Sequence, residues 1–293
     1  MVPMNENKSY IPYQEIINHL EVEQGDELVI ASDITRLALI SRKHQGSFDI
    51  REFIKSFQEK VGKEGTLLVP AYNHHLRPGE SWDIKNTKPV TGVMAISVMN
   101  NMGFVRTKNP LHSFMVWGKH AGFYSGLENK SSFGADSPFA HFAPHQSKML
   151  CISTSVAEAL TYVHFYEELA KVKYRKYKTF PIKYTDENGM SQLRDFYLFT
   201  KKKGWVSDFK HLEDEFSDSG LIRDDVSNGL KFQLLSLKAV VPVIRKEILE
   251  ERARHISFFK PGLYARETLK TYLYKLKLFT TPTDRIRHAD NIH

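Results

Sequence analysis

The chain has 293 residues, of which 41% are hydrophobic and 26% charged, as is ordinary for a soluble globular protein. Its formal net charge of +7 favours an anionic partner, such as nucleic acid, a phosphorylated small molecule or a membrane surface. The one cysteine, Cys151, excludes an intrachain disulfide and fits a reducing compartment.

The start of the chain is polar and lacks the apolar segment of a secretory signal. No apolar run approaches the ~20 residues that a membrane helix needs. We therefore expect a cytoplasmic protein with no membrane partner. No RNA-binding aromatic motif and no zinc-ligand spacing is present, so we expect no nucleic-acid partner either. His141 and His145 have the spacing of a helical ligand pair, but Pro144 between them disfavours a regular helix, and we expect no metal.

The first half of the chain alternates between strand and helix patterns. Short apolar runs that are typical of buried strands lie at 26–32, 65–72, 113–118 and 148–154. Apolar residues at helical spacing predict helices at 48–62 and 92–103, and each of these segments ends at a glycine. A polar loop, 73–91, is long enough to predict a functional role.

The second half changes character. Two strand-like runs, 178–184 and 192–199, flank Asn188 and Gly189, which predicts a hairpin. Segments 240–256 and 264–279 have the pattern of amphipathic helices. We expect an α/β fold in a single large domain, 1–293, with a central mixed sheet flanked by helices and an antiparallel hairpin in the C-terminal half. Within it, the core motifs occupy 25–180, and the hairpin and later helices occupy 181–280.

His164 and Glu167 are the first candidate for chemistry. They lie three residues apart in a segment with helical pattern and so share one face. Such a pair is most often a surface contact. It can also be a general base with a carboxylate that orients it. The pair follows the strand at 148–154, and ligands of open α/β sheets bind near the carboxyl ends of strands.

Two other segments are candidates. Arg106, His112 and Ser113 surround the start of the strand at 113–118, and Ser137-Pro138 lies in a polar turn. Each segment can also be read as a plain turn. The sequence has no Gly-x-Gly-x-x-Gly, P-loop or Gly-x-Ser-x-Gly motif, which argues against the common nucleotide-binding and hydrolase sites.

Taken in order, these segments resemble the aminoglycoside 3-N-acetyltransferase (antibiotic N-acetyltransferase) family. The matching segments are Gly25-Asp26 with Ser32, Gly65-Thr66-Leu67-Leu68-Val69-Pro70, Arg106 to Ser113 with Pro110, Gly134 to Pro138, and Thr161-x-x-His164-x-x-Glu167. The resemblance covers roughly residues 25–180, and the last motif is the most specific.

The chain departs from the family pattern at several positions. Asn109 stands where the family often has histidine, and Thr107 stands for serine. Residues 94–97 lack a glutamate that is usual in that helix, and the strand before the catalytic helix has Cys151, Ile152 and Ser153 in place of its usual glycine. We expect these departures to affect the acceptor more than the chemistry.

The resemblance implies acyl transfer from acetyl-CoA, or another acyl-CoA, to an amine of an amino sugar. His164, oriented by Glu167, would remove a proton from the attacking amine, and Ser113 or a loop N–H would donate to the thioester oxygen. Cys151 lies in an expected buried strand and is a poor nucleophile. The residues assigned to coenzyme A are Ser32, Thr35, Arg36, Arg106, His112 and Ser137. Those assigned to the acceptor are Tyr72, Asp83, Asp136 and Arg175.

The charge balance bears on the acceptor. Aminoglycosides are polycations, and the candidate loops carry few carboxylates: Asp33, Glu80, Asp83 and Asp136. A basic chain suits an anionic acceptor, so we expect a nucleotide-linked (dTDP- or UDP-) amino sugar for polysaccharide synthesis. Some relatives of this fold resemble such N-acyltransferases, and the basic run 171–178 would meet the diphosphate. An aminoglycoside acceptor is the alternative, and a non-catalytic basic binding protein is a third reading. The oligomeric state stays open.

Overall fold

A computed structural model describes residues 10–275. Its centre is a seven-stranded mixed sheet with the order β10-β11-β6-β1-β2-β5-β4. Strand β1 runs parallel to β2 and β6, and the other neighbours pair antiparallel. The strands of this sheet are β1 (Glu27–Ser32), β2 (Thr66–Tyr72), β4 (Val105–Arg106), β5 (His112–Gly118), β6 (Lys148–Ile152), β10 (Ile222–Ser227) and β11 (Leu230–Ser236). The predicted α/β fold with a central mixed sheet is confirmed.

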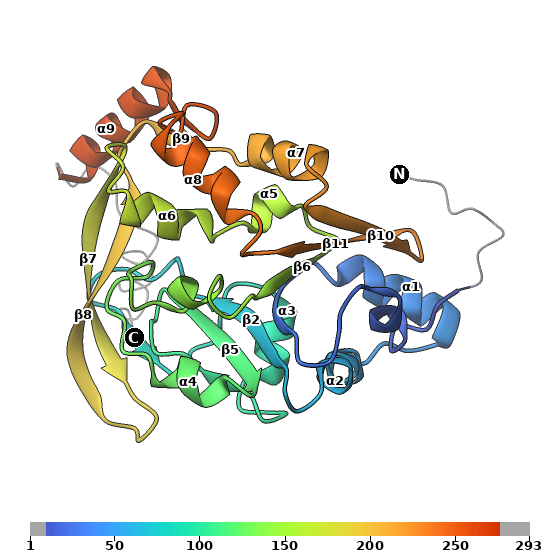
Figure 1. The fold of residues 1–293 in the computed structure, drawn as a ribbon. Coiled ribbons are helices and arrows are strands. Elements are labelled where there is room, and N and C mark those ends of the chain that lie inside the picture. The colour runs from blue at the N-terminus through green and yellow to red at the C-terminus, as the bar shows by residue number, and fades with distance from the viewer. Residues whose placement is uncertain (1–9, 276–293) are drawn as a thin grey trace.

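Helices cover both faces of the sheet (Figure 1). Because side chains alternate along a strand, Leu28 and Ile30 of β1 enter one core and Val29 enters the other. The first core is closed by η1 (Ile16–His19), α1 (Thr35–Gln45), α2 (Ile50–Val61) and α3 (Val93–Val98). The second is closed by α4 (Ala121–Gly126), η2 (Pro138–His141), α5 (Val156–Ala159), α6 (Val163–Leu169), α7 (Lys210–Asp218) and α8 (Val241–Leu249). The continuous apolar strands follow from this coverage of both faces.

The predicted hairpin is present and is longer than the two apolar runs suggested. It consists of β7 (Arg175–Thr185) and β8 (Ser191–Lys201), which meet at a turn containing Gly189 with φ of 81°. This hairpin lies at one side of the sheet (Figure 1). Strand β3 (Ser81–Asp83), from the long loop 73–91, pairs with β7 and buries Trp82 against Tyr184. The loop is therefore ordered by its own small core.

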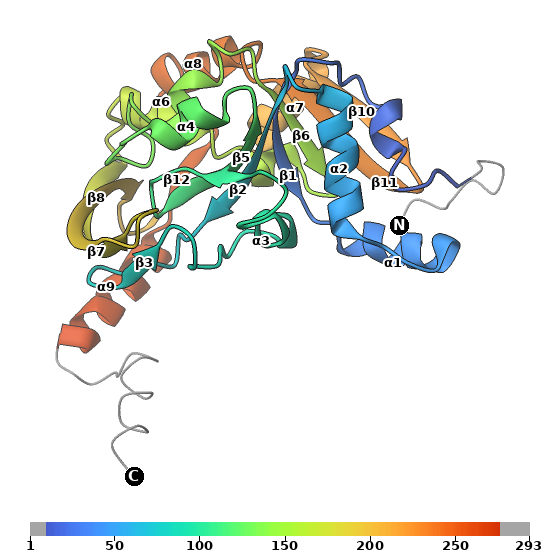
Figure 2. The same cartoon turned by 90° about the horizontal axis from the view of Figure 1, so that it is seen from below.

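The C-terminal part contains a second two-stranded sheet, formed by β9 (Trp205–Ser207) and β12 (Ser257–Phe259). Helix α9 (Pro261–Lys275) follows β12 and extends away from the body (Figure 2). The helix predicted at 264–279 is confirmed as far as 275, and its last four positions lie outside the described residues. Among the described helices, none has the length and hydropathy that a membrane crossing requires.

Two predicted helices end earlier than their patterns suggested. The helix expected at 92–103 stops at Val98, because Asn100 (φ 58°) and Met102 (φ 54°) adopt left-handed backbone conformations. The helix expected at 240–256 stops at Leu249 for the same reason, with Arg252 and Ala253 at φ of 55° and 58°. Helix α2 lies where it was predicted, because the side chain of its N-cap Asp49 accepts from Arg51 N–H and Gly62 ends it.

Candidate active site

A cavity of about 400 Å³ lies where β1, β2 and β6 end and β5 begins. Strand β5 is antiparallel to β2, so its first residue, His112, pairs with Tyr72 at the end of β2. The sheet therefore presents residues from four strands at one edge, where ligands of α/β sheets bind. The helix α6, which carries His164, begins close to this edge and closes the cavity with that residue.

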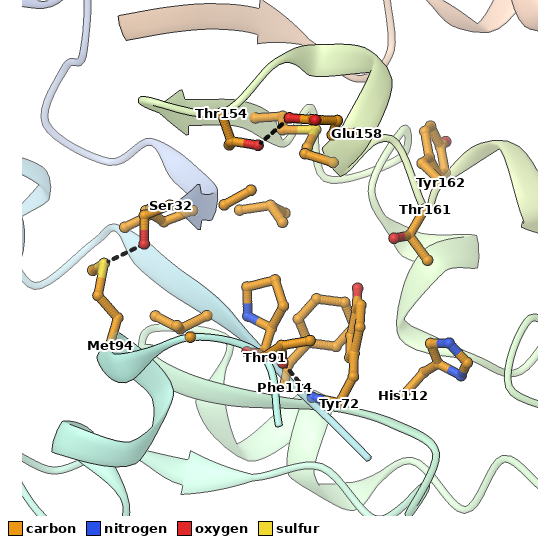
Figure 3. A pocket seen from close by; sticks show the side chains of 18 of the residues that line it. Ser32, Tyr72, Thr91, Met94, His112, Phe114, Thr154, Glu158, Thr161 and Tyr162 are labelled. Atoms are coloured by element: carbon orange, nitrogen blue, oxygen red, sulfur yellow. Dashed lines mark hydrogen bonds between the residues drawn. The ribbon is translucent and has the colours of Figure 1, made fainter. Parts of the chain in front are cut away.

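Figure 3 shows the side chains that line the cavity, which extends from Ser32 to His112. At one end the hydroxyl of Ser32 donates to the sulfur of Met94 at 2.9 Å. At the other end lie His112 and Thr161, with Tyr72 between the two ends. Aromatic and aliphatic side chains from both sides of the sheet edge provide most of the lining. An apolar cavity with a few polar groups is the usual form of a small-molecule site.

His164 and Glu167 form the pair that the helical spacing predicted. The Nδ1 of His164 lies 2.6 Å from Oε2 of Glu167. Glu167 is buried, whereas the side chain of His164 is 22% exposed and lines the cavity. If Nδ1 donates its proton to this carboxylate, Nε2 of the ring is left as the acceptor.

Glu167 is held by two further residues that follow α6. Tyr174 donates its hydroxyl to Oε1 at 2.7 Å, and Nε of Arg175 lies 2.7 Å from Oε2. Burial alone would raise the pKa of Glu167, but His164, Arg175 and Tyr174 together lower it below its usual value. Glu167 is therefore a carboxylate at neutral pH and can orient the imidazole.

Arg175 also acts on His164 directly. One of its terminal nitrogens lies 2.9 Å from Nδ1 of the imidazole. Burial and the charge of Arg175 lower the pKa of His164, and they outweigh Glu167, which raises it. His164 is consequently neutral at pH 7, which is the form that can accept a proton.

His112 is a second imidazole in the cavity. It is buried between Tyr72 and Phe133, with ring centroids at 4.8 and 4.7 Å, and Phe133 also contacts His164 at 5.2 Å. Burial, and after it repulsion from the protonated form of His164, lowers the pKa of His112 to about 3. Among the described residues its Nδ1 has no hydrogen-bond partner. Because Nδ1 is itself shielded from solvent, His112 meets the cavity through the other atoms of its ring.

Arg106 and Ser113 lie together, but they are occupied by contacts within the protein. The guanidinium of Arg106 donates to Ser113 Oγ, Asn73 Oδ1 and the carbonyls of Ala71 and Thr87. The hydroxyl of Ser113 donates in turn to Ala71 O at 2.7 Å. These contacts attach the loop 73–91 to β2, and neither side chain lines the cavity. The single proton of Ser113 is therefore already used.

The other residues assigned to coenzyme A are divided between two places. Ser32 lines the cavity, and the exposed Thr35 and Arg36 lie in the first turn of α1, directly after it. Ser137 is buried at the start of η2 with no partner for its hydroxyl among the described residues.

The residues assigned to the acceptor do not come together. Tyr72 lines the cavity, and its burial raises the pKa of its phenol, so the hydroxyl stays protonated. Asp83 accepts from Lys85 N–H and from Asn86 at the end of β3, and Asp136 is exposed in the turn before η2. Arg175 is bound to Glu167, as described above. Asp83, Asp136 and Arg175 are absent from the lining of the cavity.

Several lining residues were not assigned from the sequence. Asp33 and Glu158 supply carboxylates, and His74 supplies a third imidazole. Glu158 had a recognisable signal, because Ser155 and Glu158 form a capping box at the start of α5. Asp33 follows β1 at the carboxyl end of a parallel strand, which is also a recognisable position. The contact between Glu167 and Arg175 had no signal, since the two residues are not at helical spacing.

Cys151 lies within β6 and is fully buried. Burial raises the pKa of its thiol to about 12, so the thiolate is not formed at neutral pH. The cysteine is therefore unsuited to act as a nucleophile, as its position in an apolar run predicted.

The family model of the aminoglycoside 3-N-acetyltransferases matches residues 40–248, which is more than half of the chain. The chain belongs to this family. It is an acetyltransferase of a family whose members use acetyl-CoA, and the resemblance seen in the motifs is confirmed at this level. No curated protein matches the sequence significantly.

Solved structures of similar proteins share the fold of this acetyltransferase. AAC-IIIb in a binary complex with CoASH has a TM-score of 0.70 at 19% identity, over 86% of this chain and 99% of its own. AAC-VIa bound to sisomicin has a TM-score of 0.69 at 15% identity, over 83% and 99%. AAC(3)-Xa has a TM-score of 0.67 at 16% identity, over 81% and 91%.

Proposed function

We propose that this acetyltransferase transfers an acetyl group from acetyl-CoA directly to an amine of an amino sugar, with His164 as general base. The observation that carries the proposal is the neutral imidazole of His164. This ring lines the cavity, and the buried Glu167 holds its orientation through the contact with Nδ1. A general base of this kind is worth ~10²–10⁴-fold in rate.

In the reaction the lone pair of a neutral amine attacks the carbonyl carbon of the thioester. As the C–N bond forms, Nε2 of His164 accepts a proton from the nitrogen, and Glu167 stabilises the resulting imidazolium. The C–S bond then breaks, and the leaving thiolate takes the proton back from His164 to give free coenzyme A. The amide and the thiol are the products, and no acyl-enzyme is formed.

The thioester oxygen gains negative charge during the attack and needs a hydrogen-bond donor. We assign this role to His112 and not to Ser113, whose proton is donated to Ala71 O. The imidazole of His112 is neutral, lies in the same cavity as His164, and carries one N–H in either tautomer. A neutral histidine can polarise a carbonyl without giving up its proton.

We place the phosphates of coenzyme A at the start of α1. The first turn of this 11-residue helix carries Thr35 and Arg36 and follows Ser32, which lines the cavity. The N–H of Thr35 donates to the carboxylate of Asp33 at 3.0 Å, so the guanidinium of Arg36 and the next N–H groups of the helix are the donors left for phosphate. The pantetheine arm would then run along the apolar wall toward His164.

An aminoglycoside is the acceptor that we favour. Glu158 places a carboxylate in the cavity, which suits a substrate with an ammonium group. Two of the proteins with this fold, AAC-VIa and AAC(3)-IVa, have structures with sisomicin and with a gentamicin, respectively. The family match supports this acceptor better than the nucleotide-linked sugar that the charge of the chain suggested.

A nucleotide-linked amino sugar is the second candidate. It is supported by the net charge of +7 and by exposed Lys176 and Lys178 on β7. Arg175, from the same basic run, is buried against Glu167 and does not contribute to such a surface.

The test is thiol release from acetyl-CoA with a panel of acceptors: kanamycin, gentamicin, sisomicin, and dTDP- and UDP-linked amino sugars. We expect turnover on at least one aminoglycoside, with a product heavier by one acetyl group in mass spectrometry. Turnover only on nucleotide sugars would replace the favoured acceptor with the second candidate. Binding of acetyl-CoA and acceptor without thiol release would contradict the enzymatic reading and support a binding protein.

A further inference from the structure

A second group of titratable residues lies at the other end of β1 from the active site. Glu27 begins β1, and Ser32, which lines the cavity, ends it. At ~3.3 Å per residue, five residues separate the two by about 17 Å. The carboxylate of Glu27 is buried, with a side-chain exposure of only 3%, and two imidazoles meet it there.

The two imidazoles both direct Nδ1 at the same carboxylate oxygen. Nδ1 of His120 lies 2.7 Å and Nδ1 of His145 lies 3.2 Å from Oε2 of Glu27. The rings are 4.4 Å apart between centroids. His145 is one of the two histidines whose spacing in the sequence, with His141, is that of a helical ligand pair. The backbone N–H of His145 donates to the backbone carbonyl of His141 at 2.9 Å despite the intervening Pro144.

The remaining oxygen of Glu27 accepts hydrogen bonds from two neighbours, one of which, Tyr124, also has its hydroxyl 3.1 Å from Nδ1 of His145. Tyr124 donates its hydroxyl to Oε1 at 2.6 Å, and Ser147 donates to the same oxygen. Outer partners of this kind orient the ligands in metal sites.

We propose that Glu27, His120 and His145 form a site for a divalent transition-metal ion, with Zn²⁺ as the best-suited ion. Two imidazole nitrogens and one carboxylate oxygen are ligands that Zn²⁺ binds. In tetrahedral Zn²⁺ with bonds of about 2.0–2.1 Å, the ligand atoms lie about 3.3 Å apart. Oε2 of Glu27 and Nδ1 of His145 already lie within about 0.1 Å of this separation. The distance from Oε2 of Glu27 to Nδ1 of His120 would have to increase by about 0.6 Å.

Binding requires no deprotonation of a neutral imidazole. Each neutral ring would move its single proton from Nδ1 to Nε2 and so offer the Nδ1 lone pair to the ion. The ligand side chains of His120 and His145 are 33% and 21% exposed, which gives the ion a route from solvent. The ion would join β1, the start of α4 and the turn after η2, so its role would be to stabilise the fold.

The described residues contain one other group of this type, which provides a matched control. Nδ1 of His255 lies 2.9 Å from Oε2 of Glu247, with His211 nearby. His211 has a side-chain exposure of 45%, and its contact with Glu215 is a distant one at 4.0 Å. Only one imidazole is thus fixed on Glu247, so we expect this group to bind an ion more weakly.

The experiment uses the full chain with no affinity tag, stripped of metal and titrated with Co²⁺ or with Zn²⁺ against a chromophoric chelator. We expect one equivalent of Co²⁺ to give the intense visible absorption of a low-coordinate site. In His120→Gln this absorption should be lost and the Zn²⁺ affinity should fall by at least ~100-fold, because loss of an ion ligand costs more than loss of an outer partner. His255→Gln should bind as the wild type does.

Glutamine keeps a donor for Glu27, so His120→Gln is expected to fold, and circular dichroism checks this. His145→Gln serves as a second variant with the same expected loss. Equal Zn²⁺ affinity in wild type and in both variants would overturn the proposal, as would a loss of binding in His255→Gln alone. Failure to find acceptor turnover would not affect this result, because metal binding is measured without substrate.

Discussion

Two histidine–glutamate groups in this protein share the same contact and differ in their third partner. At His164, Nδ1 lies 2.6 Å from a buried carboxylate, and at His120 the distance is 2.7 Å. Arg175 is the third partner of the first group, and it lowers the pKa of His164. In the second group the third partner is another imidazole, His145, which adds a ligand atom.

The surroundings also differ. His164 lines a cavity of about 400 Å³, whereas His120 and His145 face partly toward solvent. A histidine–glutamate pair therefore does not determine its own role. A neighbouring guanidinium and a cavity favour the role of general base for the histidine. A second imidazole and access from solvent favour the binding of a cation by the pair.

The largest expected effect comes from removing the charge of the carboxylate behind His164. Glu167→Gln leaves Arg175 buried without its counter-charge, which should lower the free energy of unfolding by ~3–5 kcal/mol. Urea unfolding measures this loss. The neighbouring Glu168 is the control, because burial raises its pKa and Glu168→Gln removes a charge that the fold disfavours. Equal losses in the two variants would contradict the role given to Glu167.

The next effect concerns the donor to the thioester oxygen. His112→Phe keeps an aromatic ring between Tyr72 and Phe133 but removes both nitrogens. We expect kcat for thiol release to fall by ~10²–10³-fold, as for loss of one oxyanion donor. If the KM for acetyl-CoA rises while kcat is unchanged, His112 binds the cofactor, as the sequence suggested, and does not act on the oxyanion.

The third expected effect is a change in pH dependence. His164 must be neutral to act as a base, so activity falls as the pH drops through its pKa, which lies below 6.5. Arg175→Gln removes a charge that lowers this pKa, so the acid limb of kcat/KM should move to higher pH. Lys201→Gln should move it in the same direction by less, because Lys201 is the weakest of the causes. An unchanged acid limb in Arg175→Gln would show that the guanidinium does not tune the base.

The smallest expected effect is on the acceptor. Glu158 is at the surface of the cavity, and an exposed charge contact is worth ~0.2–1 kcal/mol. Glu158→Gln should therefore raise the KM for a polycationic acceptor by about 1.5–5-fold without changing the KM for acetyl-CoA. A nucleotide-linked acceptor should show no such rise, so the comparison of the two acceptors also tests the substrate.

The sequence predicted the strands of the sheet centre and the His164–Glu167 pair because both depend on local spacing. Residues 26–32, 65–72, 113–118 and 148–154 all contain or overlap sheet strands, and residues three apart on a helix share a face. The hairpin was likewise predictable from Asn188-Gly189. The resemblance to the family followed from the same ordered segments and is confirmed by the family model.

What could not be predicted depends on contacts between different elements, whose spacing in the sequence carries no pattern. Arg175 reaches Glu167 because β7 begins shortly after α6, and Glu27 meets His120 and His145 across more than ninety residues. Ser113 was assigned to catalysis from its motif, but the long-range hydrogen bond to Ala71 O occupies its proton. The identity of the acceptor stays a prediction, because the net charge averages over the surface and does not describe the cavity.

The most direct test of the central claim compares two histidines that each contact a buried glutamate. Thiol release is measured for wild type, His164→Gln and His255→Gln with acetyl-CoA and the best acceptor at saturating concentrations. We predict that kcat falls by ~10²–10⁴-fold in His164→Gln and is unchanged in His255→Gln. A kcat in His164→Gln within a few-fold of wild type, or an equal fall in both variants, would contradict the assignment of His164 as the general base.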